Sequence, residues 1–268
     1  MDHENKIMIK RDNAGLIEKS ENILKILLVL FAGYYIAAFM IVVISRIAFP
    51  FELEWMEGGV LTHVRRVLQG QSLYVKPSLE FVPFIYTPLY YYIAAVFSKI
   101  FGLNFFSLRL VSFMASIGSL GLIWKITKRK TNDSVSAFVA AGFFAACYKL
   151  SDGWYDLARV DALFIFLVLA AISALQRQPR KLVQAAVFSM LAFLTKQNAL
   201  IFILGMQIFL ALDGRKGFWK YTLICWTGIL IAVVTFSGLS RGWFAFYVFK
   251  LPFEHATVPT EWIRFWTR

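Results

Sequence analysis

Three carboxylates lie in one short segment of the chain, directly after its first long apolar run. Glu52, Glu54 and Glu57 fall within six residues. A carboxylate beside a membrane can act as a general base toward a hydroxyl group, or it can hold a divalent cation. Glu54 and Glu57 are three residues apart, which places both on one face if the segment is helical. The alternative is a solvated loop in which an acid stabilises a helix N-terminus through the helix dipole.

Side chains that could bind a phosphate group lie farther along the chain. Arg159, two residues before Asp161, has the planar guanidinium that pairs with phosphate through two hydrogen bonds. Asp161 could orient Arg159 or a reacting group. Arg109 and Lys196 are further candidates for a phosphate counter-charge. The alternative for these residues is structural: an Asp at a helix N-terminus, and cations that extend along apolar surface to reach the membrane interface.

Metal sites and the motifs of soluble enzymes receive little support. His3, His63 and His255 do not have metal-ligand spacing, and only Glu254 and His255 form an adjacent candidate pair. The sequence contains no glycine-rich phosphate loop, no Ser/His/Asp pattern and no cysteine cluster. We therefore predict no metal ligands and no certain cofactor, and a divalent cation at the acidic segment stays open.

The composition predicts an all-α, polytopic membrane protein. The 268 residues are 59% hydrophobic and 17% aromatic, with a mean hydropathy of +0.64, and several apolar runs approach the length that spans a bilayer. A net charge of +12 could indicate nucleic-acid binding. However, the basic residues cluster in short connectors between apolar runs, as topology signals and contacts with anionic lipids do. We expect membrane lipids, and no nucleic acid, as partners.

Seven membrane spans are predicted, and one further apolar run is placed in the outer interface. That run, residues 84–101, begins with two prolines and is rich in tyrosine, as interfacial segments are. If it crossed the membrane, the basic connector 125–130 would lie outside. The spans are 23–49, 105–124, 134–150, 160–175, 182–195, 197–212 and 219–238. Two short helices in 182–212 fit the charges better than one long helix, which would bury Lys196.

Charge also predicts the orientation. Positive residues favour the cytoplasmic side, so we expect a plasma (inner) membrane protein with a cytoplasmic tail at residues 1–22. The transmembrane domain would cover 23–238, with a first extracytoplasmic loop at 50–104 and an extracytoplasmic segment at 239–268. This topology places the acidic segment and Asp161 on the outer side, where we expect the functional site.

Five short motifs in order give the chain a resemblance to a known family. They are Glu57-Gly58 followed by Arg65 to Gly70, Tyr86 to Tyr92, Phe101-Gly102 followed by Arg109-Leu110, Arg159-Val160-Asp161 and Leu194-Thr195-Lys196. In this order they resemble the GT-C integral-membrane glycosyltransferases, in the group of protein O-mannosyltransferases and aminoarabinose transferases. Met56 stands where that group has the first acid of an Asp-Glu pair, and Tyr86 stands where it has a lysine. Members are usually longer, so the chain could be C-terminally truncated.

The resemblance implies transfer of a sugar from a polyprenyl-phosphate-sugar donor to a hydroxyl of a glycan, lipid or protein acceptor. Glu57, with Glu54 as second candidate, would accept the proton of the acceptor. Arg159 would stabilise the departing phosphate, with Arg109 and Lys196 as further candidates, and Asp161 would orient the site. The aromatic side chains expected to form a wall of the substrate site are Trp55, Tyr86 and Tyr90.

Two other functions stay open at this point. One is a non-enzymatic transporter or flippase of lipid-linked glycans, which internal inverted repeats and charges in the middle of spans would favour. The other is an inactive, truncated scaffold that binds lipid or a partner. The sequence does not identify the sugar or the acceptor.

Overall fold

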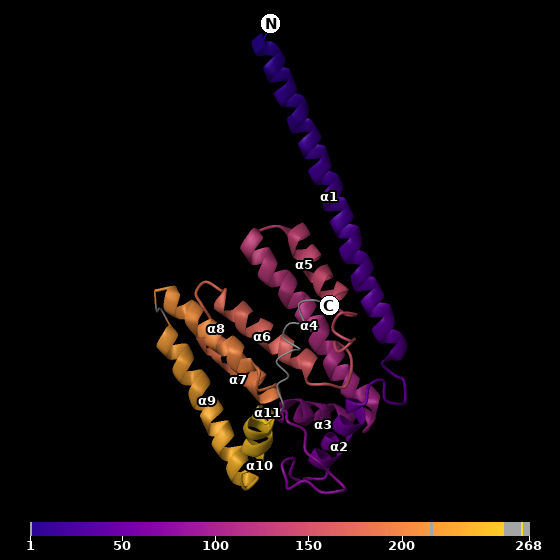
Figure 1. The fold of residues 1–268 in the computed structure, drawn as a ribbon, viewed down its shortest axis with the longest axis vertical. Helices are drawn as coiled ribbons and strands as arrows, with labels where there is room; N and C mark the ends of the chain where they lie inside the picture. The colour runs from indigo at the N-terminus through magenta and orange to yellow at the C-terminus, as the bar shows by residue number, and fades with distance from the viewer. Residues whose placement is uncertain (1, 215–216, 255–263, 265–268) are drawn as a thin grey trace.

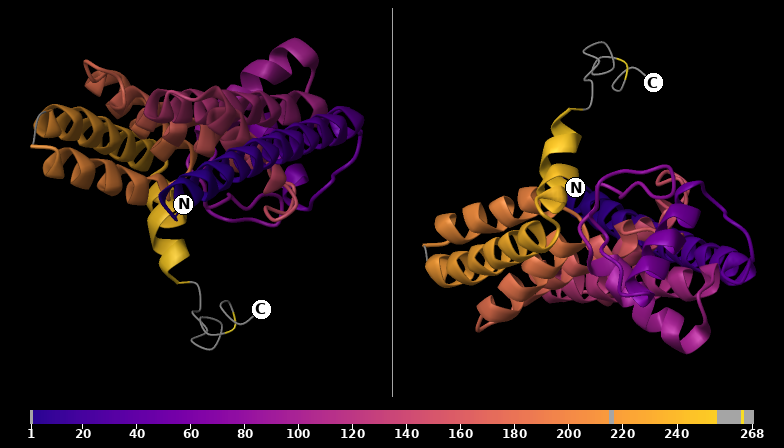
Figure 2. Two further views of the ribbon diagram at one scale, coloured as in Figure 1. Left: turned by 90° about the horizontal axis from the view of Figure 1, so that it is seen from above. Right: turned by 90° about the horizontal axis from the view of Figure 1, so that it is seen from below.

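The computed structural model describes residues 2–214, 217–254 and 264, and within these ranges the regular structure is entirely helical (Figure 1). The all-α prediction is therefore confirmed. The longer helices are α1 (Asp2–Arg46), α2 (Met56–Leu68), α3 (Leu89–Phe101), α4 (Phe105–Thr131), α5 (Ser134–Ala146), α6 (Asp161–Leu175), α7 (Leu182–Thr195), α8 (Ala199–Leu212) and α9 (Phe218–Leu239). The short α10 (Trp243–Ala245), the π-helix η1 (Phe246–Lys250) and α11 (Leu251–Phe253) follow, and Figure 2 shows them projecting away from α8 and α9.

Polar side chains determine where several helices begin and end. The Asn104 side chain accepts a hydrogen bond from the amide of Ser107 and begins α4. Asn132 ends α4 in the left-handed conformation, with φ of 54°. The next residue, Asp133, accepts hydrogen bonds from two amides and begins α5. Asn132 and Asp133 together produce the tight turn of the antiparallel pair α4–α5.

The body of the protein has two ends of different character (Figure 1). The α4–α5, α6–α7 and α8–α9 connections lie together at the upper end of the view, and they carry basic residues such as Lys130 and Arg180. At the lower end lie α2, α3, the end of α1 and the beginnings of α4 and α6. All the residues predicted for the functional site are placed on elements that meet at this lower end.

Small residues pack the helices together, and large apolar residues face outward. Ala171 of α6 and Ala185 and Ala186 of α7 have no exposed surface, which allows the backbones to approach closely. In contrast, Leu30 of α1, Ile208 of α8 and similar residues of α9 are exposed. An apolar exterior of this kind fits a lipid environment.

Among the residues that the structure describes, three helical segments are long and apolar enough to cross a membrane: Glu18–Arg46, Phe105–Thr131 and Phe218–Leu239. The helices α6, α7 and α8 have only 14 or 15 residues, or about 22 Å, which is less than a hydrocarbon core of about 30 Å. The chain is therefore a protein with membrane-spanning helices, and the number of seven spans stays a prediction.

Several predicted boundaries change in the structure. The predicted tail at 1–22 is not separate from the first span, because α1 runs without a break from Asp2 to Arg46. The interfacial helix begins at Leu89 rather than at residue 84, because Pro83 and Pro88 keep the segment before it out of helical conformation. The predicted division of 182–212 is present, since residues 196–198 separate α7 from α8. The segment from residue 255 onward, which includes His255, lies outside the described residues apart from Arg264.

A close contact between α1 and α5 gives a test of this packing. A Cβ atom at Gly142 of α5 would lie 2.4 Å from the Cα atom of Ala32 in α1. We expect Gly142→Leu to destabilise the protein by about 1–3 kcal/mol through overpacking, measured as a lower thermal unfolding temperature in detergent. The control is Gly121→Leu, because a Cβ atom at Gly121 of α4 meets nothing within 4 Å. Equal unfolding temperatures for the two variants would contradict the α1–α5 contact.

Candidate functional site

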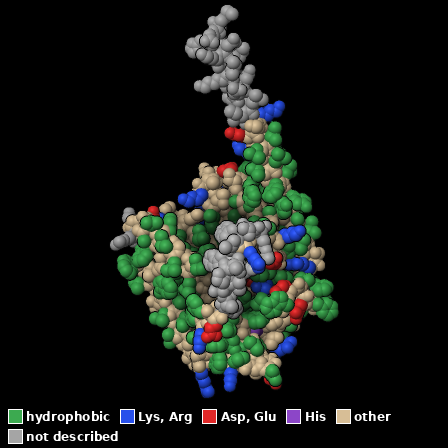
Figure 3. Space-filling model, in the orientation of Figure 1, with side chains coloured by type: hydrophobic (Ala, Val, Ile, Leu, Met, Phe, Trp, Pro, Cys, Tyr) green, Lys and Arg blue, Asp and Glu red, His purple; other side chains and the backbone are tan. Residues whose placement is uncertain are grey.

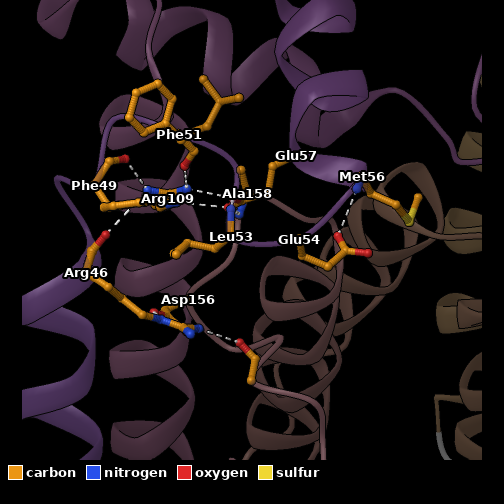
Figure 4. Close-up of polar contacts among 12 residues, drawn as sticks. Arg46, Phe49, Phe51, Leu53, Glu54, Met56, Glu57, Arg109, Asp156 and Ala158 are labelled. Atoms are coloured by element: carbon orange, nitrogen blue, oxygen red, sulfur yellow. Dashed lines mark hydrogen bonds and ion pairs between the residues drawn. The ribbon is translucent and has the colours of Figure 1, made fainter.

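A fully buried ion pair connects the acidic segment to α4 (Figure 4). The Arg109 guanidinium donates from Nε to Glu57 Oε1 at 2.9 Å and from Nη2 to Oε2 at 2.6 Å, and both side chains are 0% exposed. The amides of Leu53 and Ala158 donate to the same carboxylate at 2.7 and 2.8 Å. Each oxygen of Glu57 therefore accepts two hydrogen bonds and has no surface left for a substrate.

The remaining donors of Arg109 bind the backbone between α1 and α2. Its Nη1 donates to the carbonyl oxygen of Phe49 at 2.6 Å, and its Nη2 donates to that of Phe51 at 2.7 Å. A longer contact of 3.4 Å joins Nη1 to the carbonyl oxygen of Arg46 at the end of α1. One guanidinium thus fixes the loop on which the other two acids lie. Burial raises the pKa of the Glu57 carboxyl, but the hydrogen bonds from Arg109, Ala158 and Leu53 outweigh this effect and hold the pKa below its ordinary value.

A second charged network is partly open to solvent. Glu54 lies 3.1 Å from Nη1 of Arg159, whose Nε donates to Asp161 at 3.1 Å. Lys196 donates to the other oxygen of Asp161 at 2.6 Å. The side chains of Glu54 and Lys196, at the two ends of this row, are each 18% exposed. The network therefore presents one anionic and one cationic group to a ligand, whereas the Glu57–Arg109 pair presents none.

Aromatic rings border this network. The guanidinium of Arg159 lies 4.0 Å from the centre of the Trp154 ring, and the Lys196 ammonium lies 5.5 Å from that of Tyr86. Burial lowers the pKa of Arg159, but Asp161 and Glu54 outweigh it and the pKa is raised, so the side chain keeps its charge.

Hydrogen bonds from neighbouring elements fix the backbone on which these groups lie. On α4, Ser112 donates to the carbonyl oxygen of Arg159 at 3.2 Å, and Ser116 donates to that of Tyr155 at 2.5 Å. On the other side, Thr87 donates to the carbonyl oxygen of Phe193 at 2.6 Å, near the end of α7. Side-chain hydroxyls thus join the loops at both sides of the site to α4 and α7.

A third group of residues, which the sequence analysis did not select, anchors the loop before α6. Arg46, at the end of α1, donates to both oxygens of Asp156 at 2.7 and 2.6 Å and to the carbonyl oxygen of Gly153 at 3.1 Å. The Tyr148 hydroxyl also donates to Asp156, at 2.9 Å. One signal could have identified Arg46: it is an arginine at the predicted outer end of a span, against the positive-inside rule.

The structure separates the residues proposed for one site into two groups. Arg159, Asp161, Lys196, Glu54 and Tyr86 come together, whereas Glu57 and Arg109 pair behind them. Tyr90, which was expected to line a substrate, is fully buried, and its hydroxyl donates to the carbonyl oxygen of Leu108 in α4, so a substrate contact by Tyr90 stays a prediction. Trp55 is 75% exposed, so a substrate contact by Trp55 stays a prediction. Within the described residues, no three His, Cys, Asp or Glu side chains could hold a metal ion.

His63 joins α2 to the segment before α3. Its Nε2 accepts the amide hydrogen of Phe84 at 2.9 Å, so Nδ1 carries the proton and donates to the carbonyl oxygen of Gly59 at 2.7 Å. Its ring stacks on Phe84 and Tyr91. Burial lowers the pKa of His63 to about 4, so the side chain is neutral near pH 7. The His63 side chain therefore lies in the core.

Comparison with known proteins gives two matches. The family model described as dolichyl-phosphate-mannose-protein mannosyltransferase matches residues 83–240, which include Arg159, Asp161 and Lys196 but not the acidic segment. The crystal structure of ArnT from Cupriavidus metallidurans in the apo state is similar over 84% of this chain, with a TM-score of 0.56 and 15% sequence identity. The chain covers 44% of that protein's length, and at this identity the likeness shows the fold. No curated protein matches the chain.

Disruption of the buried Glu57–Arg109 pair should destabilise the protein strongly, and a second substitution should reverse part of the loss. Arg109→Met leaves the Glu57 carboxylate buried without its cation, and we expect a loss of about 3–5 kcal/mol in stability. Glu57→Gln in the same chain should recover part of this loss, because the uncompensated charge is removed. Thermal unfolding in detergent measures both effects, with the exposed Arg65→Met as control. An Arg109→Met protein as stable as the control would contradict the structural role.

The stability of the protein should also depend on His63 between pH 6.5 and 4. The unfolded side chain takes up a proton near pH 6.5, and the folded one near pH 4. The unfolded state therefore binds more protons in this range, and stability falls by up to about 3 kcal/mol as the pH is lowered through it. His63→Gln should be less stable near pH 7 and should lose this part of the pH dependence. If the unfolding temperatures of the wild type and of His63→Gln changed in parallel with pH, His63 would not be the source of this pH dependence.

Proposed function

The chain belongs to the dolichyl-phosphate-mannose-protein mannosyltransferase family, and on this premise we propose that it transfers a sugar from a polyprenyl-phosphate-sugar to an acceptor hydroxyl. The observation that carries the proposal is the partly exposed row Glu54, Arg159, Asp161 and Lys196. It offers a carboxylate for proton transfer at one end and a cation for a phosphate at the other.

Glu54 is the proton acceptor in this proposal. Both oxygens of Glu57 are occupied by Arg109 and two amides, and the side chain is fully buried, so an acceptor hydroxyl has no access to it. Glu54 is partly exposed and accepts a hydrogen bond from the amide of Met56 at 3.1 Å. The Glu54 carboxylate therefore lies beside Met56, the position at which the glycosyltransferases that this chain resembles have an acid. The order of the two candidates is reversed relative to the expectation from sequence.

The donor phosphate would bind at the cationic side of the row. Arg159 and Lys196 both contact Asp161, so Asp161 holds the two cations close together. As the acceptor oxygen bonds to the anomeric carbon, the bond from that carbon to the phosphate oxygen breaks. The acceptor proton moves to Glu54, and the lipid phosphate leaves with the bonding electron pair. Arg159 and Lys196 stabilise the negative charge that develops on the phosphate.

The surroundings fit a substrate that is partly lipid. The row lies near the segment before α3, at the end of the body where α2 and α3 lie across the helices. A polyprenyl chain can remain in the bilayer while the phosphate and sugar reach this end, which we place at the outer face of the plasma membrane. Glu54 pairs with Arg159 and Asp161 pairs with Lys196. The charges of the two carboxylates are therefore balanced by side chains, and the proposed transfer does not involve a metal ion. A glycan, a lipid or a protein can supply the hydroxyl group, and a hexose or a pentose can be the sugar.

Substitution of Glu54 should affect activity alone, whereas substitution of Glu57 should affect both activity and stability. We expect Glu54→Gln to lower the turnover of labelled polyprenyl-phosphate-sugar in proteoliposomes by about 100-fold or more, because a general base is lost, with an unfolding temperature close to that of the wild type. Glu57→Gln should lower the unfolding temperature as well as turnover.

The matched control is Glu80→Gln, which removes an exposed carboxylate from the same extracytoplasmic loop. Release of free polyprenyl phosphate is the readout, since a flippase would move the intact donor lipid without releasing it. Wild-type turnover by Glu54→Gln would remove Glu54 from the mechanism. Absence of release from the wild-type chain with any donor would contradict the transferase proposal.

A further inference from the structure

A groove opens at the end of the body opposite to the charged row. It lies between α6 and α8, reaches the end of α4, and has a volume of about 660 Å³. Its walls are mainly apolar, with Ile172 on one side and Ile201, Phe202 and Phe209 on the other. Its residues do not overlap with the Glu54–Lys196 row, so it is independent of the proposed transfer.

The dimensions of the groove match one acyl chain. Along α8 the lining residues run from Ile201 to Asp213, a rise of about 18 Å. One leaflet contributes about 15 Å to the hydrocarbon core. Gly205 lies in the middle of this wall, and a Cβ atom built on it would meet nothing within 4 Å. The groove is therefore open where an acyl chain would pass.

Basic side chains border the end of the groove near the α4–α5 and α6–α7 connections. They are Arg129, Lys130 and Arg180, and among the described lining residues Asp213 is the only acid. Arg129 is held in place by hydrogen bonds to the carbonyl and hydroxyl oxygens of Ser173 at 2.9 and 3.1 Å. Arg180 pairs with Asp213. Figure 3 shows Lys and Arg side chains at the upper end of the body, above a largely hydrophobic surface.

Two buried polar atoms of the groove lack a partner in the described structure. They are Nε of Arg180 and Oε1 of Gln176, and both residues line the groove. Only Nε of Arg180 is a donor, since Oε1 of Gln176 is itself an acceptor; a buried donor without an acceptor is unfavourable by about 1–3 kcal/mol, and a ligand that supplies an acceptor to Arg180 removes this penalty. Because the donor belongs to a cation and the nearby charge is mostly positive, an anion is the favoured acceptor.

We propose that this groove binds one anionic phospholipid of the adjacent leaflet. Its phosphate contacts Arg180 and Lys130, and one acyl chain lies along α8 over Gly205. Basic pockets between membrane helices are suited to anionic headgroups because attraction to the phosphate adds to burial of the acyl chain. The lipid would complete the contact between α6 and α8.

Two substitutions test the acyl chain and the headgroup separately. Gly205→Leu places a larger side chain at the groove, from a position where an added Cβ atom meets nothing within 4 Å, and Gly121→Leu on α4 is its matched control at another open helical glycine. Lys130→Gln removes a cation from the groove. Lys128→Gln on the same helix turn is its matched control, because Lys128 does not line the groove and donates to Asn132.

The experiment titrates the full chain in detergent with phosphatidylglycerol or phosphatidylcholine of identical acyl chains, and counts bound lipids by native mass spectrometry. We expect one saturable phosphatidylglycerol site that binds phosphatidylcholine more weakly. Lys130→Gln should weaken phosphatidylglycerol binding about fivefold, and Gly205→Leu should abolish the site for both lipids. Both control variants should bind as the wild type does, and circular dichroism should show equal helicity for all five proteins.

Four results would overturn the proposal. One is equal affinity of the site for the two lipids, and another is unchanged phosphatidylglycerol binding by Gly205→Leu. The third is displacement of the lipid by glycerol 1-phosphate alone at comparable concentration, which would indicate a site for a free phosphate. A dimer that Gly205→Leu dissociates would show instead that a second copy of the chain occupies the groove.

Discussion

The buried pair of Glu57 and Arg109 is the interaction on which the arrangement of this end of the protein depends. It joins α2 to α4, and through carbonyl and amide groups it also holds the loop after α1 and the loop before α6. An ion pair in an apolar environment is favourable only when its remaining donors and acceptors are satisfied. Here four backbone groups satisfy them. These hydrogen bonds offset the desolvation free energy of the two buried charges, and they also determine the conformation of the loops.

This arrangement explains why two similar networks of charges can have different roles. The Glu57–Arg109 pair is closed, because each of its oxygens has two donors and none of its surface is exposed. The row from Glu54 to Lys196 is held by fewer contacts and ends in two partly exposed groups. Rigidity in the first network positions the second, since Glu54 lies on the loop that Arg109 fixes. A reacting group needs this combination of a fixed backbone and free lone pairs.

The sequence was sufficient for the helices and for the set of charged residues, but not for their pairing. Apolar runs and caps such as Asn104 and Asp133 are local signals, and they place α4 and α5 within a few residues. The pairing of Glu57 with Arg109 joins residues 52 positions apart, and either glutamate could have met either arginine. His63 shows the same limit, because its burial depends on Phe84 and Tyr91 from another segment. Burial decides which acid can react, and burial is a property of the tertiary structure.

The two ends of the body also differ in how they use positive charge. At the end with α2 and α3, each cation of the site faces a carboxylate, so the row from Glu54 to Lys196 has no net charge before a ligand binds. At the opposite end, Arg129, Lys130 and Arg180 share one described acid in their groove, Asp213, which pairs with Arg180, so the remaining positive charge attracts an anion. A site that must release its product benefits from internal carboxylates that compete for the same cations. A site that retains a structural lipid does not need such competition, and the unpaired charge at this end favours permanent occupancy.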